Sequence, residues 1–235
     1  MSLIKVPLLF ADAIGMRITG KPPNEPLPLI EHVVPDWREK FLKSLAWPCV
    51  LLRAIYWSAG IIEMTVIIAN HTPSLAVSQF ITSTIVFNSR NHGIAITPLF
   101  LFGNFLTIVG TAIRLQCYRA LGRLFTFELS IRQDHRLVSE GPYAVVRHPS
   151  YTGMILTITG AICSQYSGSW LTECGLLDMW FGKVLAIYWL LVAGAVVTSL
   201  ILRISVEDRL LQRKFGNEWV EWSRKVPYGL IPWVY

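Results

Sequence analysis

The sequence predicts an all-α polytopic membrane protein with about five transmembrane helices, and three observations support this fold class. Of the 235 residues, 53% are hydrophobic and only 15% are charged, whereas soluble domains carry roughly 25% charged residues. The mean hydropathy is +0.46. Several apolar stretches are also long enough for a helix to cross a hydrocarbon core of about 30 Å.

Five apolar stretches are candidates for these helices. Three of them are clear, at residues 45–69, 94–115 and 181–202. Residues 151–167 are shorter but contain no charged residue, so we count them as spanning. Residues 3–16 are interrupted by Lys5 and Asp12 and form the weakest candidate. Because no small-residue cleavage site of a signal peptide follows it, we expect this segment to stay in the protein.

The first segment is separated from the others by a proline-rich connector. Residues 20–36 hold five prolines, a composition typical of extended linkers. The stretch that follows, residues 37–45, is amphipathic. We find no internal repeat, low-complexity tract or separate soluble domain, so the chain reads as one membrane-embedded unit.

Glu63 lies deep in the apolar stretch 45–69. An unpaired acid in lipid costs several kcal/mol, so such a residue is either functional or has a partner inside the helix bundle. We favour a structural partner, with Asn104 or Arg53 as the candidates.

Glycines recur a heptad apart on two apolar stretches, as Gly103 with Gly110 and Gly153 with Gly160. Small residues let helix backbones approach closely inside membranes. These pairs therefore predict close helix packing.

Basic residues gather in two regions of the chain. Six arginines lie between residues 114 and 147, and six basic residues follow Leu202, whereas the connections 70–93 and 168–180 together hold only Arg90. Lysine and arginine concentrate on cytosolic loops. We therefore place both basic regions on the cytosolic side, where they can meet, and attribute the net charge of +6 to membrane orientation and not to nucleic-acid binding.

The four cysteines do not indicate a metal site. Cys49, Cys117, Cys163 and Cys174 form no C-x-x-C pair and have no nearby histidine at ligand spacing. We interpret them as buried thiols.

The polar segment 128–153 joins two apolar stretches. Gly141 and Pro142 predict a turn, and Pro149 is suited to the first position of the next helix. The helix start would then present backbone amides and its positive dipole end beside His148, a setting that favours a ligand with a carboxylate.

A second polar cluster follows the last apolar stretch. Arg203 and Glu207 are four residues apart and so share one helix face. Taken alone, this spacing equally fits an idle surface ion pair, which is worth little.

Three runs in this half of the chain resemble the signature of the isoprenylcysteine carboxyl methyltransferase family. They are G-P-Y-A-V-V-R-H-P-S-Y-T-G from residue 141, E-D-R-L-L-Q-R-K-F-G-N-E-W-V-E-W from residue 207, and V-P-Y-G-L-I-P from residue 226. The resemblance covers most of residues 128–232. One departure is that the family's paired glutamates are Glu207 and Asp208 here.

The resemblance implies a cytosolic-side pocket for S-adenosylmethionine, formed by the 116–150 loop and the carboxyl-terminal helical tail. The residues that it implies for cofactor binding are Glu128, His135, Arg136, Leu137, Val138, Tyr143, His148, Pro149, Ser150, Tyr151 and Glu207. Arg203 would bind the substrate carboxylate and act as the catalytic residue. On this view residues 1–115 form amino-terminal membrane helices with the connector, and residues 116–235 form the catalytic region with two further membrane helices.

The resemblance also implies partners and a location. The substrates would be prenylated CaaX-type protein termini or small prenylcysteines, in the endoplasmic reticulum membrane, with the active site facing the cytosol and no metal or nucleic acid involved. A prenylcysteine carboxylate is ionised at neutral pH, so methyl transfer needs no general base. We therefore expect His148 to bind the cofactor and not to move a proton.

Three other functions stay open from the sequence. A phospholipid N-methyltransferase has a similar arginine-histidine-proline segment and the same cofactor, but it methylates an amine and needs no carboxylate clamp. A membrane sterol reductase also carries a histidine-proline-tyrosine element, with a nicotinamide cofactor. The third alternative is a non-enzymatic helical scaffold, in which the polar clusters would have no chemical role.

Overall fold

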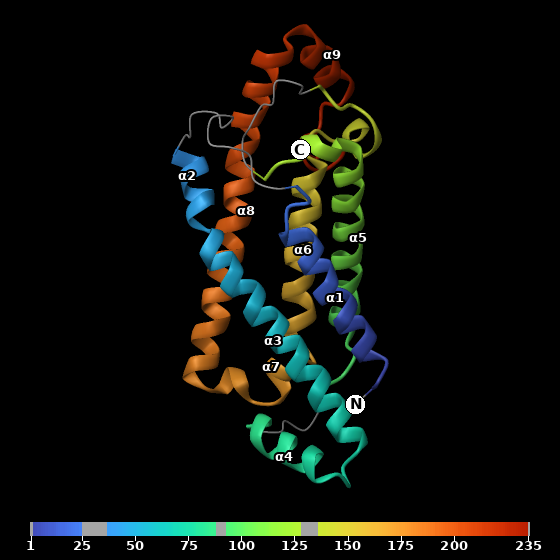
Figure 1. Ribbon diagram of the computed structural model, residues 1–235, viewed down its shortest axis with the longest axis vertical. Helices are drawn as coiled ribbons and strands as arrows, with labels where there is room; N and C mark the ends of the chain where they lie inside the picture. The colour runs from blue at the N-terminus through green and yellow to red at the C-terminus, as the bar shows by residue number, and fades with distance from the viewer. Residues whose placement is uncertain (1, 25–36, 88–92, 128–135, 235) are drawn as a thin grey trace. The chain divides into compact units, whose positions relative to one another are not determined.

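The computed structural model describes residues 2–24, 37–87, 93–127 and 136–234, and within these ranges every regular element is helical (Figure 1). The longer helices are α1 (Lys5–Gly20), α2 (Trp37–Ser44), α3 (Ala46–His71), α4 (Ala76–Ile85), α5 (Pro98–Leu121), α6 (Pro149–Tyr166), α8 (Trp180–Phe215) and α9 (Asn217–Lys225). Four short elements connect them: η2 (Gly122–Leu124), η3 (Gly141–Ala144), α7 (Trp170–Glu173) and η4 (Leu176–Asp178). The all-α polytopic prediction is confirmed.

Among the described residues, three helices are long and apolar enough to cross a membrane: Ala46–His71, Pro98–Leu124 and Trp180–Phe215. They coincide with the three clear stretches of the sequence. The two weaker stretches also form helices, α1 with 16 residues and α6 with 18, but neither combines length and apolar composition to the same degree. The three clear spans are thus confirmed, and the total of five remains a prediction.

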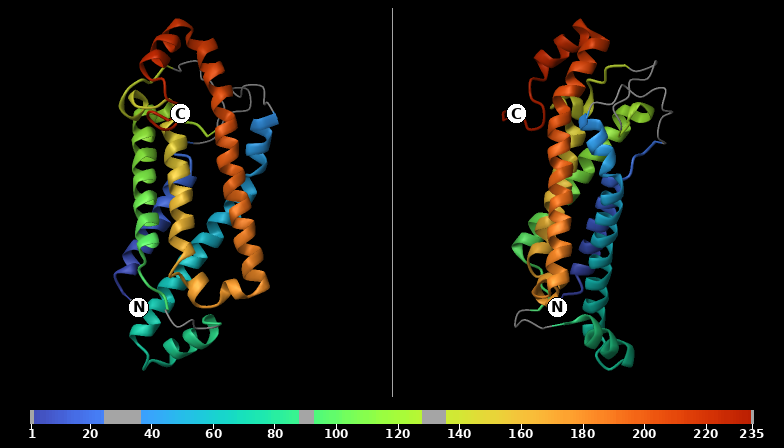
Figure 2. Two further views of the ribbon diagram at one scale, coloured as in Figure 1. Left: turned by 180° about the vertical axis from the view of Figure 1, so that it is seen from behind. Right: turned by 90° about the vertical axis from the view of Figure 1, so that its left-hand side faces the viewer.

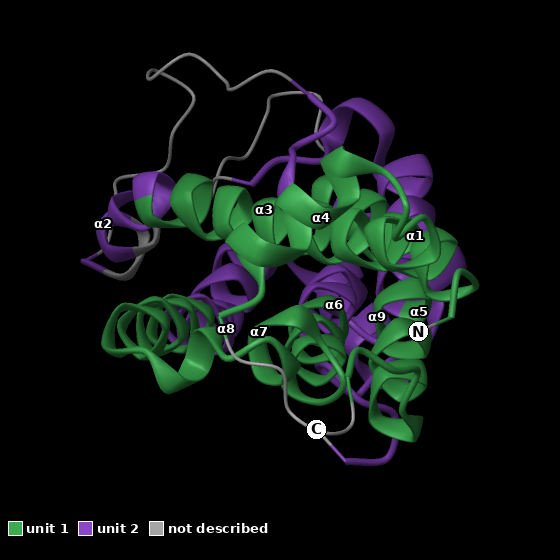
Figure 3. Ribbon diagram, turned by 90° about the horizontal axis from the view of Figure 1, so that it is seen from below, with its two compact units in different colours: residues 1–17, 48–109, 156–193 green, residues 18–47, 110–155, 194–235 purple. Residues whose placement is uncertain are grey.

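The chain divides into two compact units, each assembled from three separate segments (Figure 3). Unit 1 comprises residues 1–17, 48–109 and 156–193. Its core is apolar and includes Val66, Ile67 and Phe100, all fully buried. The short elements α7 and η4, which follow α6 in the chain, also belong to this core through Trp170 and Leu176.

Unit 2 comprises residues 18–47, 110–155 and 194–235. Its core is smaller and more aromatic, with Cys117, Phe125, Tyr143, Trp222 and Val226. Members of this core come from α5, from η3 and from the region of α9, so these parts of the chain pack together. All of the described residues that the sequence predicted as site residues lie in this unit.

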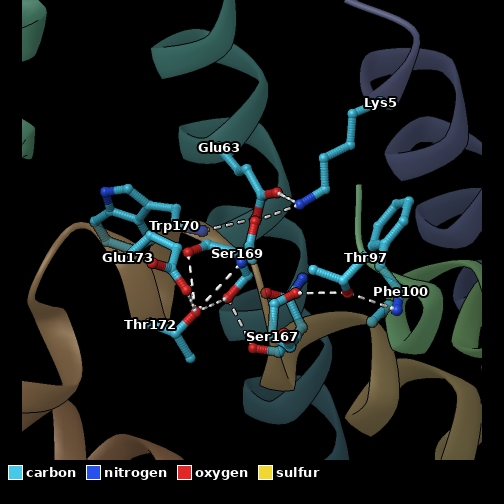
Figure 4. Close-up of polar contacts among 12 residues, drawn as sticks. Lys5, Glu63, Thr97, Phe100, Ser167, Ser169, Trp170, Thr172 and Glu173 are labelled. Atoms are coloured by element: carbon cyan, nitrogen blue, oxygen red, sulfur yellow. Dashed lines mark hydrogen bonds and ion pairs between the residues drawn. The ribbon is translucent and has the colours of Figure 1, made fainter. Parts of the chain in front are cut away.

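Glu63 has a structural partner, as expected, but neither proposed partner was right. The Lys5 ammonium lies 2.6 Å from Oε1 of Glu63, and the backbone amide of Trp170 donates to Oε2 at 3.0 Å (Figure 4). Lys5 also donates to the Gly168 carbonyl at 2.7 Å. Asn104 instead donates to Asp12 at 2.9 Å. Lys5, one of the two charged residues that interrupt the apolar stretch 3–16, is therefore the residue that pairs with Glu63.

The heptad-spaced glycines do mark close contacts between α5 and α6. In unit 1, a Cβ added to Gly103 would lie 2.6 Å from the Gly160 carbonyl oxygen. In unit 2, a Cβ added to Gly153 would lie 2.7 Å from the Gly110 carbonyl oxygen. Side chains larger than glycine would therefore separate the two helices.

Helix α8 continues well beyond its apolar part, to Phe215, so Arg203, Glu207 and Asp208 are on one uninterrupted helix. Gly216, with a φ of 55°, turns the chain into α9. Figure 2 shows α9 folding back from α8, followed by the carboxyl-terminal tail, which reaches the start of α6. This turn brings the third signature run into contact with the first.

Candidate functional site

The first turn of α6 carries the histidine-proline-serine-tyrosine run. Pro149 is the first residue of the helix, as predicted. Its fixed φ and missing amide suit this position. The His148 carbonyl accepts from the Tyr151 amide at 3.0 Å and from the Thr152 amide at 3.3 Å, which closes the first turn. His148 and Tyr151 therefore lie on the same side, with their rings stacked at 5.3 Å between centroids.

This turn meets the polar face of α8 within unit 2. The Tyr151 hydroxyl donates to Oε2 of Glu207, and Nε2 of His148 bonds to Oδ1 of Asp208 at 3.0 Å. One helical turn earlier on α8, Nε of Arg203 lies 3.9 Å from Oε2 of Glu207. The prediction that the two basic, motif-bearing regions meet is thus confirmed.

Asp208 determines which nitrogen of the His148 ring carries a proton and how the ring is oriented. A carboxylate can only accept a hydrogen bond, so Nε2 of His148 must carry the proton that it shares with Oδ1 of Asp208. The other ring nitrogen, Nδ1, lies 3.9 Å from Oε2 of Glu207. The side chain of His148 is only 4% exposed. This environment holds the imidazole in one orientation, with Nδ1 directed toward the Glu207 side of the site.

Arg147 joins three parts of unit 2 and was not among the predicted site residues. Its Nε lies 3.3 Å from Oδ2 of Asp208. Its Nη1 donates to the Val226 carbonyl at 3.1 Å and to the Pro227 carbonyl at 2.5 Å. Both Arg147 and Asp208 stand beside predicted residues in the signature runs, which is the signal that could have identified them.

The carboxyl-terminal tail bonds to the segment directly before α6. We expected open backbone amides at the helix start that would favour a carboxylate; the structure adds that the two amides directly before the helix bond to the tail. Arg147 donates to the Tyr228 carbonyl at 2.9 Å and His148 donates to the Gly229 carbonyl at 2.8 Å. Thr152 adds a side-chain bond to the Leu230 carbonyl at 2.7 Å. The segment directly before α6 is therefore anchored to the tail.

Arg203 is almost buried, with 7% of its side chain exposed. Its Nη1 donates to the Phe127 carbonyl at 2.6 Å. The guanidinium is thus held on one side by backbone and on the other by Glu207. A buried guanidinium in such a setting interacts more strongly with an anionic ligand than one in water would, because solvent screening is weak there.

The remaining predicted residues fall into two groups. Leu137 and Val138 are half-buried and pack against the core that contains Tyr143, while Arg136 is exposed. Pro149 and Ser150 are buried. Glu128 and His135 lie outside the described residues. The structure thus joins His148 and Tyr151 to Arg203 and Glu207, and it places Leu137, Val138 and Tyr143 in the neighbouring apolar core.

Tyr143 remains a neutral phenol at any physiological pH. Burial, followed by the nearby Cys117 and Glu207 side chains, raises its pKa well above the usual value. Its backbone carbonyl accepts from the Trp222 indole at 3.2 Å. Tyr143 therefore presents an uncharged aromatic ring and hydroxyl near the site. Among the described residues, no group of three histidine, cysteine, aspartate or glutamate side chains could hold a metal ion.

Comparison with known proteins shows which family the chain resembles. Residues 103–167 match the isoprenylcysteine carboxyl methyltransferase (ICMT) family model. Protein-S-isoprenylcysteine O-methyltransferase B of Arabidopsis thaliana is 27% identical over 195 residues, which are 79% of this chain and 85% of that protein. These matches make the chain similar to the isoprenylcysteine carboxyl methyltransferase family. A probable protein-S-isoprenylcysteine O-methyltransferase of Oryza sativa subsp. indica is 29% identical over 135 residues, 54% of this chain and 59% of that protein.

A second similarity is more local. A Delta(14)-sterol reductase of Saccharomyces cerevisiae is 37% identical over 72 residues, but these are 30% of this chain and 16% of the reductase. The methyltransferases of the family align over a much larger share of both chains. The family resemblance drawn from the sequence is therefore confirmed, and the reductase likeness is confined to a short region.

Proposed function

We propose that this chain transfers the methyl group of S-adenosylmethionine to the carboxylate of a prenylated cysteine at a protein's carboxyl terminus. One observation carries the proposal: a nearly buried arginine, Arg203, lies beside Glu207, which in turn bonds to Tyr151 at the start of α6. This arrangement puts a cation for a carboxylate next to polar and aromatic groups for a cofactor. Small prenylcysteines would bind through the same carboxylate.

Arg203 is the residue that would bind the substrate. A guanidinium offers five N–H donors in a planar fork that matches the two oxygens of a carboxylate. The bond to the Phe127 carbonyl uses one donor and fixes the plane of the fork. The substrate carboxylate is already ionised at neutral pH, so Arg203 needs only to orient it, with one oxygen toward the methyl group, and to exclude water.

The part of the site around Glu207, Tyr151 and Tyr143 fits the cofactor. Glu207 keeps 30% of its side chain exposed, so its carboxylate can accept bonds from a ligand's amino group or ribose hydroxyls. Tyr151 and Tyr143 offer aromatic faces, which attract cations. S-adenosylmethionine supplies an electrophilic methyl group on a sulfonium cation when bound. The assignments of Glu128, His135, Arg136, Leu137, Val138, Pro149 and Ser150 to the cofactor rest on the family resemblance.

His148 would orient the site without moving a proton. Its Nε2 proton is committed to Asp208, and an ionised nucleophile gives up no proton during methyl transfer. A phospholipid N-methyltransferase would instead need a proton acceptor for the amine and would have no use for Arg203. The geometry therefore favours the carboxylate substrate.

The prenyl chain would enter from the bilayer. Each methylene moved out of an apolar environment costs about 0.8 kcal/mol, so the substrate's tail stays in lipid while its carboxylate reaches Arg203. The basic residues around the site favour the cytosolic side, and the family resemblance favours the endoplasmic reticulum membrane. Residues 116–235 would form the catalytic region, carried by the amino-terminal membrane helices.

The test is methyl transfer by the full chain in detergent, with labelled S-adenosylmethionine and two acceptors in parallel, beside a separate assay of NADPH-dependent sterol reduction. We expect base-labile label on N-acetyl-S-farnesylcysteine, because a carboxyl methyl ester hydrolyses in base. Label on phosphatidylethanolamine alone would assign the chain to the N-methyltransferases. NADPH-dependent reduction of a sterol diene without any methyl transfer would assign it to the reductases.

A further inference from the structure

Arg114 is a buried cation that neither the sequence analysis nor the proposed reaction uses. It lies on α5 within unit 2 and is 3% exposed. Burying a guanidinium is costly unless its donors are satisfied. The contacts of Arg114 therefore show which parts of the protein its charge stabilises.

The two ends of the Arg114 fork bond to two different helices. Nη1 donates to the Ser150 hydroxyl at 2.6 Å and to the Ser150 carbonyl at 3.3 Å. Nη2 donates to the Thr19 carbonyl at 2.8 Å, in the last turn of α1. Carbonyls in the last turn of a helix have no partner within the helix, and a cation there is stabilised by the helix dipole. Arg114 thus ties the end of α1 to the start of α6.

Aromatic rings enclose the same guanidinium. Its carbon lies 5.1 Å from the ring centroid of Tyr118, 5.4 Å from that of Phe125 and 5.0 Å from that of Phe127. Cation–π contacts of this kind strengthen when they are desolvated. They hold the Phe125–Phe127 segment against α5.

Both segments held by Arg114 belong to the proposed site. Ser150 directly precedes Tyr151, which bonds to Glu207. Phe127, whose ring packs on Arg114, presents its carbonyl to Arg203 at 2.6 Å. Gly153 makes room for this arrangement, since a Cβ there would lie 2.9 Å from Cγ of Arg114.

We propose that Arg114 is a positioning residue for methyl transfer: it sets the place of Ser150 and Phe127, and through them the start of α6 and the plane of the Arg203 fork. The inference rests on the proposed function. Arg114 touches neither reactant, so its effect passes entirely through these two contacts. A lysine cannot replace it, because one ammonium cannot reproduce the fork that spans Ser150 and Thr19.

The test compares Arg114→Lys with Arg119→Lys, a matched change at an exposed arginine of the same helix. The full chain in detergent is assayed for kcat with N-acetyl-S-farnesylcysteine, for the Kd of S-adenosylhomocysteine and for the unfolding midpoint. Misplaced reacting groups typically cost about 10²-fold in rate. We expect a fall of that order in kcat for the folded Arg114→Lys protein and a weaker Kd, together with a lowered midpoint because the bonds of the fork are lost, with Arg119→Lys like wild type.

Two outcomes would overturn the inference while leaving the proposed function intact. One is wild-type kcat and Kd in a folded Arg114→Lys protein, and the other is a lowered midpoint with wild-type kcat in the folded fraction. If Arg114→Lys does not fold, Phe127→Leu decides, because it removes the ring that packs on Arg114 and keeps the carbonyl to which Arg203 donates: a reduced kcat supports the inference and an unchanged kcat overturns it. A wild-type chain that neither binds S-adenosylhomocysteine nor transfers methyl would overturn the proposed function and this inference together.

Discussion

Each compact unit holds an acid on a long helix, Glu63 on α3 in unit 1 and Glu207 on α8 in unit 2. Glu63 is fully buried, and its two oxygens meet the Lys5 ammonium and the Trp170 amide. Glu207 keeps 30% of its side chain exposed, bonds to Tyr151 and stays 3.9 Å from Arg203. The same type of residue is therefore closed off in one unit and open to a ligand in the other.

The difference shows how to distinguish a structural charge from a functional one inside a membrane protein. A buried ion pair whose atoms all have partners holds helices in place, and it has nothing to offer a ligand. In unit 2 the charges are more numerous and only partly closed off, with Arg147, Arg203, Glu207 and Asp208 around His148. Exposure and incomplete pairing, and not burial alone, mark the site.

The largest effect is expected from breaking the pair in unit 1. Glu63→Leu leaves the Lys5 ammonium buried without its counter-charge, which typically costs 3–5 kcal/mol of folding stability. Replacing both partners, as Lys5→Met with Glu63→Leu, should restore most of that loss. Thermal unfolding in detergent measures both. A folded Glu63→Leu protein with a wild-type midpoint but no methyl transfer would show that Glu63 is functional after all.

The second-largest effect is expected from removing Arg203 in unit 2. Arg203→Ala removes the proposed carboxylate ligand, and losses of this kind typically reduce kcat by about 10²–10³-fold. Binding of S-adenosylhomocysteine should persist, because Arg203 is assigned to the substrate. Arg213→Ala, at an exposed position of the same helix, is the control. Loss of cofactor binding in Arg203→Ala with turnover intact would reverse the assigned roles.

A smaller effect is expected from disturbing helix packing in unit 1 without changing any charge. A Cβ on Gly160 would lie 2.5 Å from both the Gly103 carbonyl oxygen and the Thr107 hydroxyl. Gly160→Ala should therefore cost about 1–3 kcal/mol, as overpacking usually does. Gly60→Ala is the matched control, since no atom lies within 4 Å of an added Cβ. Equal unfolding midpoints for the two variants would contradict the close helix contact.

An effect of similar size is expected from removing the open acid itself. Glu207→Ala removes one charge-assisted contact to the cofactor, and such contacts are worth about 1.5–3 kcal/mol, so the Kd of S-adenosylhomocysteine should rise by roughly tenfold or more. Glu218→Ala, at an exposed acid on α9, should leave it unchanged. Calorimetry measures both. An unchanged Kd in Glu207→Ala would show that Glu207, like Glu63, makes no contact with the cofactor.

Much of the site could be predicted because its information is local. Pro149 opens α6 since proline favours the first helical position, and Arg203 and Glu207 share a face because four residues make about one helical turn. The partners across the bundle could not be predicted in this way. An apolar run containing Glu63 says that the acid needs a partner, but the choice of Lys5 over Asn104 or Arg53 depends on which helices pack together.

The sequence by itself therefore determined the membrane class, the three clear spans, the glycine contacts and the family that the chain resembles, because apolar runs, heptad spacing and contiguous motifs are properties of neighbouring residues. Only the tertiary structure decided that Asp208 orients His148, that the tail occupies the amides before α6, and that Arg114 ties α1 to Ser150. These contacts join residues far apart in the chain. Their geometry exists only once the helices have packed.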